Sequence, residues 1–154
     1  MKCKILFIAA LIWFPICVNA QKKIQAKHFD FSCDCTEVEN YYEPKNSSNN
    51  YSYINEKQRF GYTFATREIL FRNKSEQKDF LKAIKNSGTL NYQWQNFLGQ
   101  EAIVADLNSQ EEPIYVKHIA FFYNNVAYTI MVFAKSPSQL KQHFNHLKNT
   151  LKLK

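Results

Sequence analysis

The sequence predicts an α+β domain, in which an antiparallel β-sheet carries two main helices packed on it. Alternating aromatic and β-branched residues at positions 59–71, 99–107 and 115–133 have the period-two pattern of strands. Segments near residues 75–86 and 137–151 have the apolar spacing of amphipathic helices. The order strand, helix, strands, helix, with short connections, favours an antiparallel sheet covered by helices.

Composition and charge exclude several other classes of protein. The chain has 154 residues, of which 45% are hydrophobic and 16% aromatic, and only three are glycine. This composition excludes collagen-like chains, glycine-rich linkers and acidic disordered proteins. The length allows one ordinary domain. A formal charge of +7 is compatible with attraction to anionic surfaces.

The first twenty residues have the pattern of a secretory signal peptide. Two lysines precede an apolar run over residues 5–16, and the segment ends in Val18-Asn19-Ala20. This run is too short for a transmembrane helix. We therefore expect cleavage after Ala20, a secreted or periplasmic location, and no transmembrane helix after cleavage. Lipidation at Cys17 is disfavoured because no small residue precedes this cysteine.

Residues 21–55 are expected to form an irregular N-terminal segment with one strand and an exposed loop. Alternation from His28 to Cys35 predicts the strand. The polar cluster from Pro44 to Asn50 predicts the loop. The α+β domain itself is expected over residues 56–154.

Two strands at residues 115–133 are expected to form a hairpin around Asn124-Asn125, since asparagine tolerates the left-handed conformation of a two-residue type I′ turn. Both faces of this hairpin are largely apolar, so we expect it to be central in its sheet. The predicted turn opposes the pairs Tyr123 and Val126, Phe121 and Tyr128, and Ile119 and Ile130.

Each predicted helix has recognisable ends. Asn73 or Ser75 is expected to cap the first, which should bury Phe80, Leu81 and Ile84 and end before Gly88. Ser136 and Pro137 begin the second. The apolar stripe of this second helix is expected to pack on the hairpin and consists of Leu140, Phe144, Leu147 and Leu151.

Three features of the last two thirds of the chain together resemble the PsbP-like α/β/α family of small exported proteins. They are a Gly-Gln-Glu-Ala strand at residues 99–102, an aromatic hairpin at residues 119–132, and a final helix followed by Leu151-Lys152-Leu153. The resemblance implies a small extracytoplasmic accessory or binding domain. It carries no catalytic signature, and the fold serves several roles.

Cys33-Asp34-Cys35 allows three interpretations. In a regular strand the two Cα atoms would lie about 6.6 Å apart, so a disulfide would need a kink. The first interpretation is a local structural disulfide or a pair of half-buried thiols. The second is a thiol–disulfide redox site. The third is a metal site in which His28 joins the two cysteines as a ligand, with His118 as a candidate fourth ligand.

The remaining histidines suggest no catalytic site. His143 and His146 are three residues apart and are expected to be a solvated, partly stacked pair on the last helix. His118 is expected to be a hydrogen-bonded residue of the sheet. No nucleophile, zinc or phosphate-binding motif is present in the sequence.

The expected function is that of an exported small accessory or binding protein with no catalytic activity and no cofactor. The first alternative is a redox or metal-binding protein that acts through Cys33 and Cys35. The second is a cationic binder of anionic surfaces, with Lys141, Lys148 and Lys152 as candidates. The expected partner is another exported protein or an anionic cell-surface component, and no nucleic acid is expected.

Overall fold

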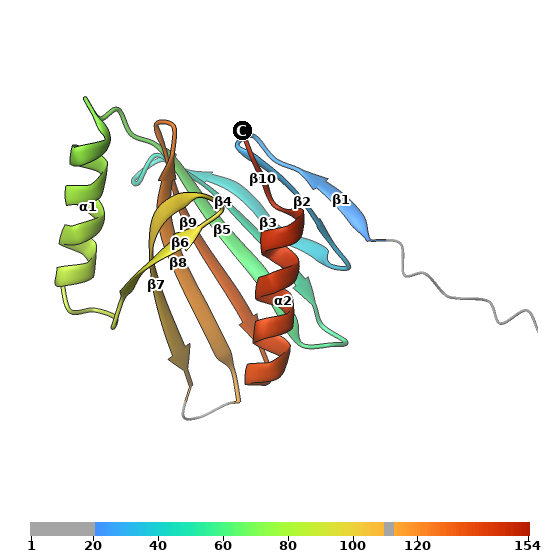
Figure 1. The fold of residues 1–154 in the computed structure, drawn as a ribbon. Helices are drawn as coiled ribbons and strands as arrows, with labels where there is room; N and C mark the ends of the chain where they lie inside the picture. The colour runs from blue at the N-terminus through green and yellow to red at the C-terminus, as the bar shows by residue number, and fades with distance from the viewer. Residues whose placement is uncertain (1–20, 110–112) are drawn as a thin grey trace, which may run out of the picture.

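The computed structural model describes residues 21–109 and 113–154, and it confirms the α+β class. The predicted signal peptide, residues 1–20, lies outside the described residues. Two helices, α1 (Lys74–Asn86) and α2 (Pro137–Thr150), lie on opposite faces of a large sheet (Figure 1). Neither of these helices has the length and apolar character that a membrane span requires.

Ten strands form two antiparallel sheets within the described residues. The small sheet has the order β1-β2-β10, and the large sheet has the order β3-β4-β5-β9-β8-β7-β6. The strands are β1 (Lys22–Gln25), β2 (Phe29–Cys33), β3 (Thr36–Glu43), β4 (Ser48–Asn55), β5 (Phe60–Glu68), β6 (Gln93–Phe97), β7 (Gln100–Asn108), β8 (Tyr115–Tyr123), β9 (Val126–Ala134) and β10 (Lys152–Leu153).

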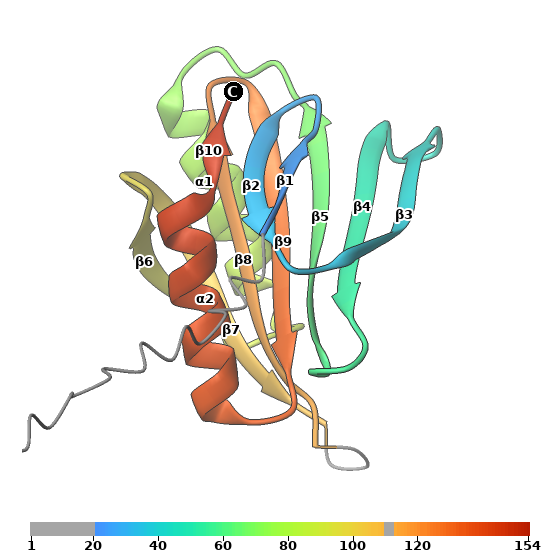
Figure 2. The same ribbon diagram turned by 90° about the vertical axis from the view of Figure 1, so that its right-hand side faces the viewer.

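Among residues 21–109 and 113–154, the larger of two apolar cores lies between the large sheet and a layer formed by α2 and β2 (Figure 2). The predicted stripe of α2 lies here, with Leu147 fully buried. Phe29 of β2 is also fully buried, and its ring stacks on Phe64 of β5 with centroids 4.2 Å apart. Strand β2 therefore covers the part of the sheet that α2 does not reach.

The smaller core lies under α1, on the opposite face of β7 and β8. Asn73 caps α1 by accepting from the backbone N–H of Glu76, as predicted. Leu81 is buried, whereas Phe80 remains 39% exposed. The burial expected for Phe80 is therefore wrong, because this residue lies at the rim of the helix interface.

The predicted hairpin forms between β8 and β9 in the expected register, and it is central in the large sheet. The predicted type I′ turn is wrong, because only the first of its two residues, Asn124, has a positive φ (54°). The pattern of two positive φ angles occurs instead at Leu98 (53°) and Gly99 (78°), between β6 and β7. Gly99, which follows Leu98, has no Cβ and adopts a positive φ without a steric penalty.

The expectation of an irregular segment over residues 21–55 is wrong, since this segment forms four strands. Strand β3 lies at the edge of the sheet, with nearly all its side chains exposed. Its polar residues therefore lack the apolar alternation that identifies half-buried strands. The expected loop at 44–50 shrinks to the turn before Ser48, which begins β4 and is buried.

Candidate functional site

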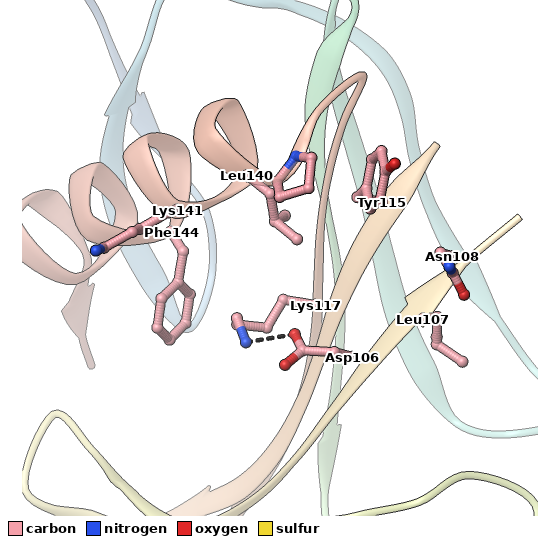
Figure 3. Close-up of a pocket in the computed structure, with 9 residues that line it drawn as sticks. Asp106, Leu107, Asn108, Tyr115, Lys117, Leu140, Lys141 and Phe144 are labelled. Carbon is pink, nitrogen blue, oxygen red and sulfur yellow. Dashed lines mark hydrogen bonds and ion pairs between the residues drawn. The ribbon is translucent and has the colours of Figure 1, made fainter. Parts of the chain in front are cut away.

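A groove of about 520 Å³ lies between the first half of α2 and the ends of β7 and β8 (Figure 3). Its volume is in the range that small-molecule sites occupy. Apolar side chains form most of its walls. They are Leu107, Tyr115, Pro137, Leu140 and Phe144, and the polar lining residues are Asp106, Asn108, Lys117 and Lys141.

The local fold explains why these residues meet. The amphipathic stripe of α2 turns Leu140 into the core and leaves Phe144 half-buried on the groove side. In the β7–β8 ladder, Asp106 lies directly opposite Lys117. Residues that are directly opposite in an antiparallel pair point to the same face, so this polar pair forms the strand side of the groove.

Lys117 is held beneath the helix. Its ammonium forms an ion pair with Asp106, and its Nζ lies 5.3 Å from the ring centroid of Phe144. The side chain of Lys117 is only 16% exposed, whereas that of Asp106 is 68% exposed. A cation therefore lies against an aromatic ring inside a largely apolar groove, which is a favourable contact.

The three lysines proposed from the sequence have different positions. Lys141 lines the groove. Lys148 lies over the ring of Phe144, with Nζ 5.6 Å from its centroid. Lys152 belongs to β10, opposite Asp30, and does not line the groove. Lys117 was not among the site residues predicted from the sequence, although a lone lysine within an apolar strand is a signal that a charge is partly buried there.

Cys33 and Cys35 are joined by a disulfide. Strand β2 ends at Cys33 and the chain bends at Asp34, so the two Cα atoms lie 5.2 Å apart. This bend is the kink that the sequence analysis required for a bridge. The Asn55 side chain holds it by donating to the backbone oxygen of Asp34 at 2.7 Å.

The candidate metal ligands are not brought together. His28 precedes β2, whereas Cys33 ends it. His28 Nε2 lies 3.4 Å from Glu68 Oε1. His118 projects toward the α1 side of the sheet, packed on Tyr92. In the described part of the chain no group of three or more His, Cys, Asp or Glu side chains has the geometry to hold a metal ion.

The prediction of a solvated pair at His143 and His146 is wrong. His143 is buried, and its ring stacks on Phe60 with centroids 3.6 Å apart. His146 Nε2 donates to the backbone oxygen of Ser32 at 2.7 Å. The small sheet covers this side of α2, and its position is not evident from helical spacing alone.

Buried histidines have lowered pKa values in this protein. Burial lowers the pKa of His143, and the nearby His146 lowers it further. Burial likewise lowers the pKa of His118. Nδ1 of His118 lies 3.0 Å from the hydroxyl of Tyr92, so the prediction of a hydrogen-bonded sheet histidine is confirmed.

A second cavity, of about 490 Å³, brings together two groups of residues that the sequence analysis treated separately. It is lined by Cys33 from β2 and by both histidines of α2, along with Tyr62 from β5. A further cavity of about 650 Å³ is lined by Cys35 but not by Cys33. The two sulfur-bearing residues therefore border different cavities.

No protein-family model matches the chain, and no curated protein sequence matches it significantly. The class of protein that the structure defines is an α+β protein with helices on both faces of a seven-stranded antiparallel sheet. The resemblance to the PsbP-like family stays a prediction.

Proposed function

We propose that this protein is a small exported binding protein without catalytic activity of its own, and that the groove beside α2 holds a small amphipathic anion. The observation that carries this proposal is the position of Lys117, whose ammonium lies among apolar groove walls at the ring of Phe144. An accessory role of this kind agrees with the resemblance to small exported binding domains.

The apolar walls favour a ligand with a hydrophobic body. Leu140, Phe144 and Tyr115 line opposite sides of the groove. Burial of such a body contributes about 25 cal/mol for each Å² removed from water. A hydrocarbon group of a few rings has a size that fits a groove of about 520 Å³.

The charges favour a negative group on that body. Two lysines and one aspartate line the groove, and Lys148 adds another cation at the ring of Phe144. Lys117 has three donor positions on its ammonium, and Asp106 lies on one side of it. A carboxylate or sulfonate that reaches Lys117 would form a hydrogen bond between charged groups, which is stronger than a neutral one.

The test compares two fluorescent probes that share an apolar body and differ in charge. 8-Anilinonaphthalene-1-sulfonate carries a sulfonate, and N-phenyl-1-naphthylamine lacks it. We expect the sulfonate to bind more tightly to the protein. In the Lys117→Met variant, which keeps an apolar stem, the sulfonate should bind about tenfold more weakly, while the neutral probe should bind almost unchanged.

Two variants make the test specific. Phe144→Ala should weaken the binding of both probes, because it removes a wall of the groove. Lys82→Met is the matched control, since this exposed lysine belongs to α1 on the opposite face. Equal effects of Lys117→Met and Lys82→Met would contradict the groove. Binding to phosphatidylglycerol vesicles that depends on all surface lysines alike would favour the cationic surface binder instead.

A further inference from the structure

The disulfide between Cys33 and Cys35 separates two cavities. Cys33 borders the cavity that contains His143 and His146, and Cys35 borders the other one. Asp34, the residue between them, borders both. An incoming molecule in the 650 Å³ cavity therefore meets Cys35, whereas the 490 Å³ cavity lies on the side of Cys33.

The two cysteines also differ in exposure. Cys33 is 1% exposed and belongs to the main apolar core. Cys35 is only partly buried and lies against the edge of that core. A nucleophile must reach a sulfur before thiol–disulfide exchange occurs, and access decides which sulfur is attacked. Cys35 is the accessible one.

The bridge closes a ring of only three residues. A disulfide stabilises a protein mainly by constraining the unfolded chain, and the constraint grows with the length of the closed loop. A bridge across one intervening residue therefore adds little of this stabilisation. Strand β2 is also held by its pairing with β1 and β10, so we expect the fold to persist without the bridge.

We propose that this disulfide is an exchange site that accepts electrons from an external dithiol. One thiolate of the dithiol attacks Sγ of Cys35, the bond between the two cysteine sulfurs breaks, and Cys33 leaves as a thiolate that takes a proton from water. The second thiol of the dithiol gives its proton to water, and the resulting thiolate attacks the dithiol sulfur of the mixed disulfide. Cys35 leaves as a thiolate and takes a proton from water. The protein gains two electrons and two thiols, and the dithiol becomes a disulfide.

The cavity beside Cys33 suits a leaving thiolate. Its lining includes polar groups beside its aromatic residues, namely the amides of Asn145 and Asn149 and the imidazole of His146. His146 is held one residue from Cys33 by its hydrogen bond to the oxygen of Ser32. The bend at Asp34, fixed by Asn55, keeps the reduced cysteines close together for reoxidation.

The experiment traps the first intermediate in the wild-type protein. The folded protein is treated briefly with reduced glutathione, quenched with acid and alkylated, and the peptides are mapped. Proteolytic cleavage before Asp34 separates the two cysteines, and Cys3 and Cys17 are mapped in other peptides. We expect glutathione on Cys35 and an alkylated free thiol on Cys33.

Single-cysteine variants give an independent measurement. With Cys3 and Cys17 replaced by serine in both variants, the free Cys35 of Cys33→Ala should react with 5,5′-dithiobis(2-nitrobenzoic acid) at least about tenfold faster than the free Cys33 of Cys35→Ala, because access limits the rate. Circular dichroism verifies that each variant is folded. Where a variant does not fold, the wild-type map alone decides the assignment.

Two results would overturn the proposal. One is glutathione found equally on both cysteines or mainly on Cys33. The other is reduction of the wild-type disulfide by dithiothreitol only at the rate of global unfolding, which would make it an inert structural bridge.

Discussion

The hydroxyl of Tyr62 lies 3.2 Å from Nδ1 of His143 and 3.3 Å from the backbone oxygen of the same histidine. Both side chains are buried, and the His143 ring is stacked on Phe60. Burial raises the pKa of Tyr62 and lowers that of His143. The pair is therefore stable as two neutral groups and links α2 to the centre of the large sheet.

The protein should lose stability as the pH falls below about 6.5, the ordinary imidazole pKa. The lowered pKa of His143 means that the unfolded chain binds more protons than the folded one in this range. His28 and His118 shift in the same direction because of burial. The contribution of these histidines to the free energy of unfolding is fully present above the pKa that they have in the unfolded chain. Urea unfolding at intervals from pH 7.5 to pH 5 measures the loss.

His143→Asn tests how much of this pH dependence comes from His143. The amide keeps a polar atom near the Tyr62 hydroxyl but does not titrate, so the variant should be less stable at pH 7.5 with a shallower slope below pH 6.5. Asn145→Ala, on the exposed side of the same helical turn, should keep the wild-type slope. An unchanged slope in His143→Asn would contradict the assignment.

Gly61→Ala should destabilise the protein by about 2 kcal/mol, as overpacking does in a filled interior. A Cβ at Gly61 would lie 2.6 Å from the backbone oxygen of Tyr53 and against the ring of Phe133. The ring can rotate away, but the oxygen belongs to the neighbouring strand β4 and cannot. Thermal unfolding compares this variant with Thr63→Ala on the same strand, which should change stability by much less.

Features set by local chemistry were predictable from the sequence, and features set by distant neighbours were not. The capped helices and the register of the β8–β9 hairpin depend on residues near each other in the chain, such as Asn73 and Glu76. The burial of His143 depends on Phe60, and Ser32 binds His146 across the chain. Lys117 gains its position from Asp106 and from Phe144 of α2.

The edge strand β3 shows the same limit. Its residues pair with β4 through the backbone, and almost none is buried. Backbone pairing leaves no mark on side-chain periodicity, so an exposed strand with three glutamates among its eight residues lacks the pattern of a half-buried strand. The residue pattern therefore did not predict the four strands that residues 21–55 form.

Arg59→Gly should stabilise the protein by about 0.5 kcal/mol. Arg59 is exposed and has φ of 56°, a conformation that costs a residue with a Cβ about 1–2 kcal/mol. Glycine removes that cost and loses part of the gain to its greater freedom in the unfolded chain. Lys57→Gly, in the same turn but without a positive φ, should lower stability instead. Equal melting temperatures for the two variants would contradict this reasoning.

Reduction of the Cys33–Cys35 disulfide should leave the protein folded and lower its free energy of unfolding by about 1.6 kcal/mol. The value follows from the entropy of closing a three-residue ring in the unfolded chain. The strand β2 stays anchored by Phe29 and Phe31, which are buried against the large sheet. Urea titrations measure this difference in the free energy of unfolding. They compare the oxidised protein with the reduced, unalkylated protein in excess dithiothreitol. A loss of the unfolding transition on reduction would show that the small ring stabilises far more than its length allows.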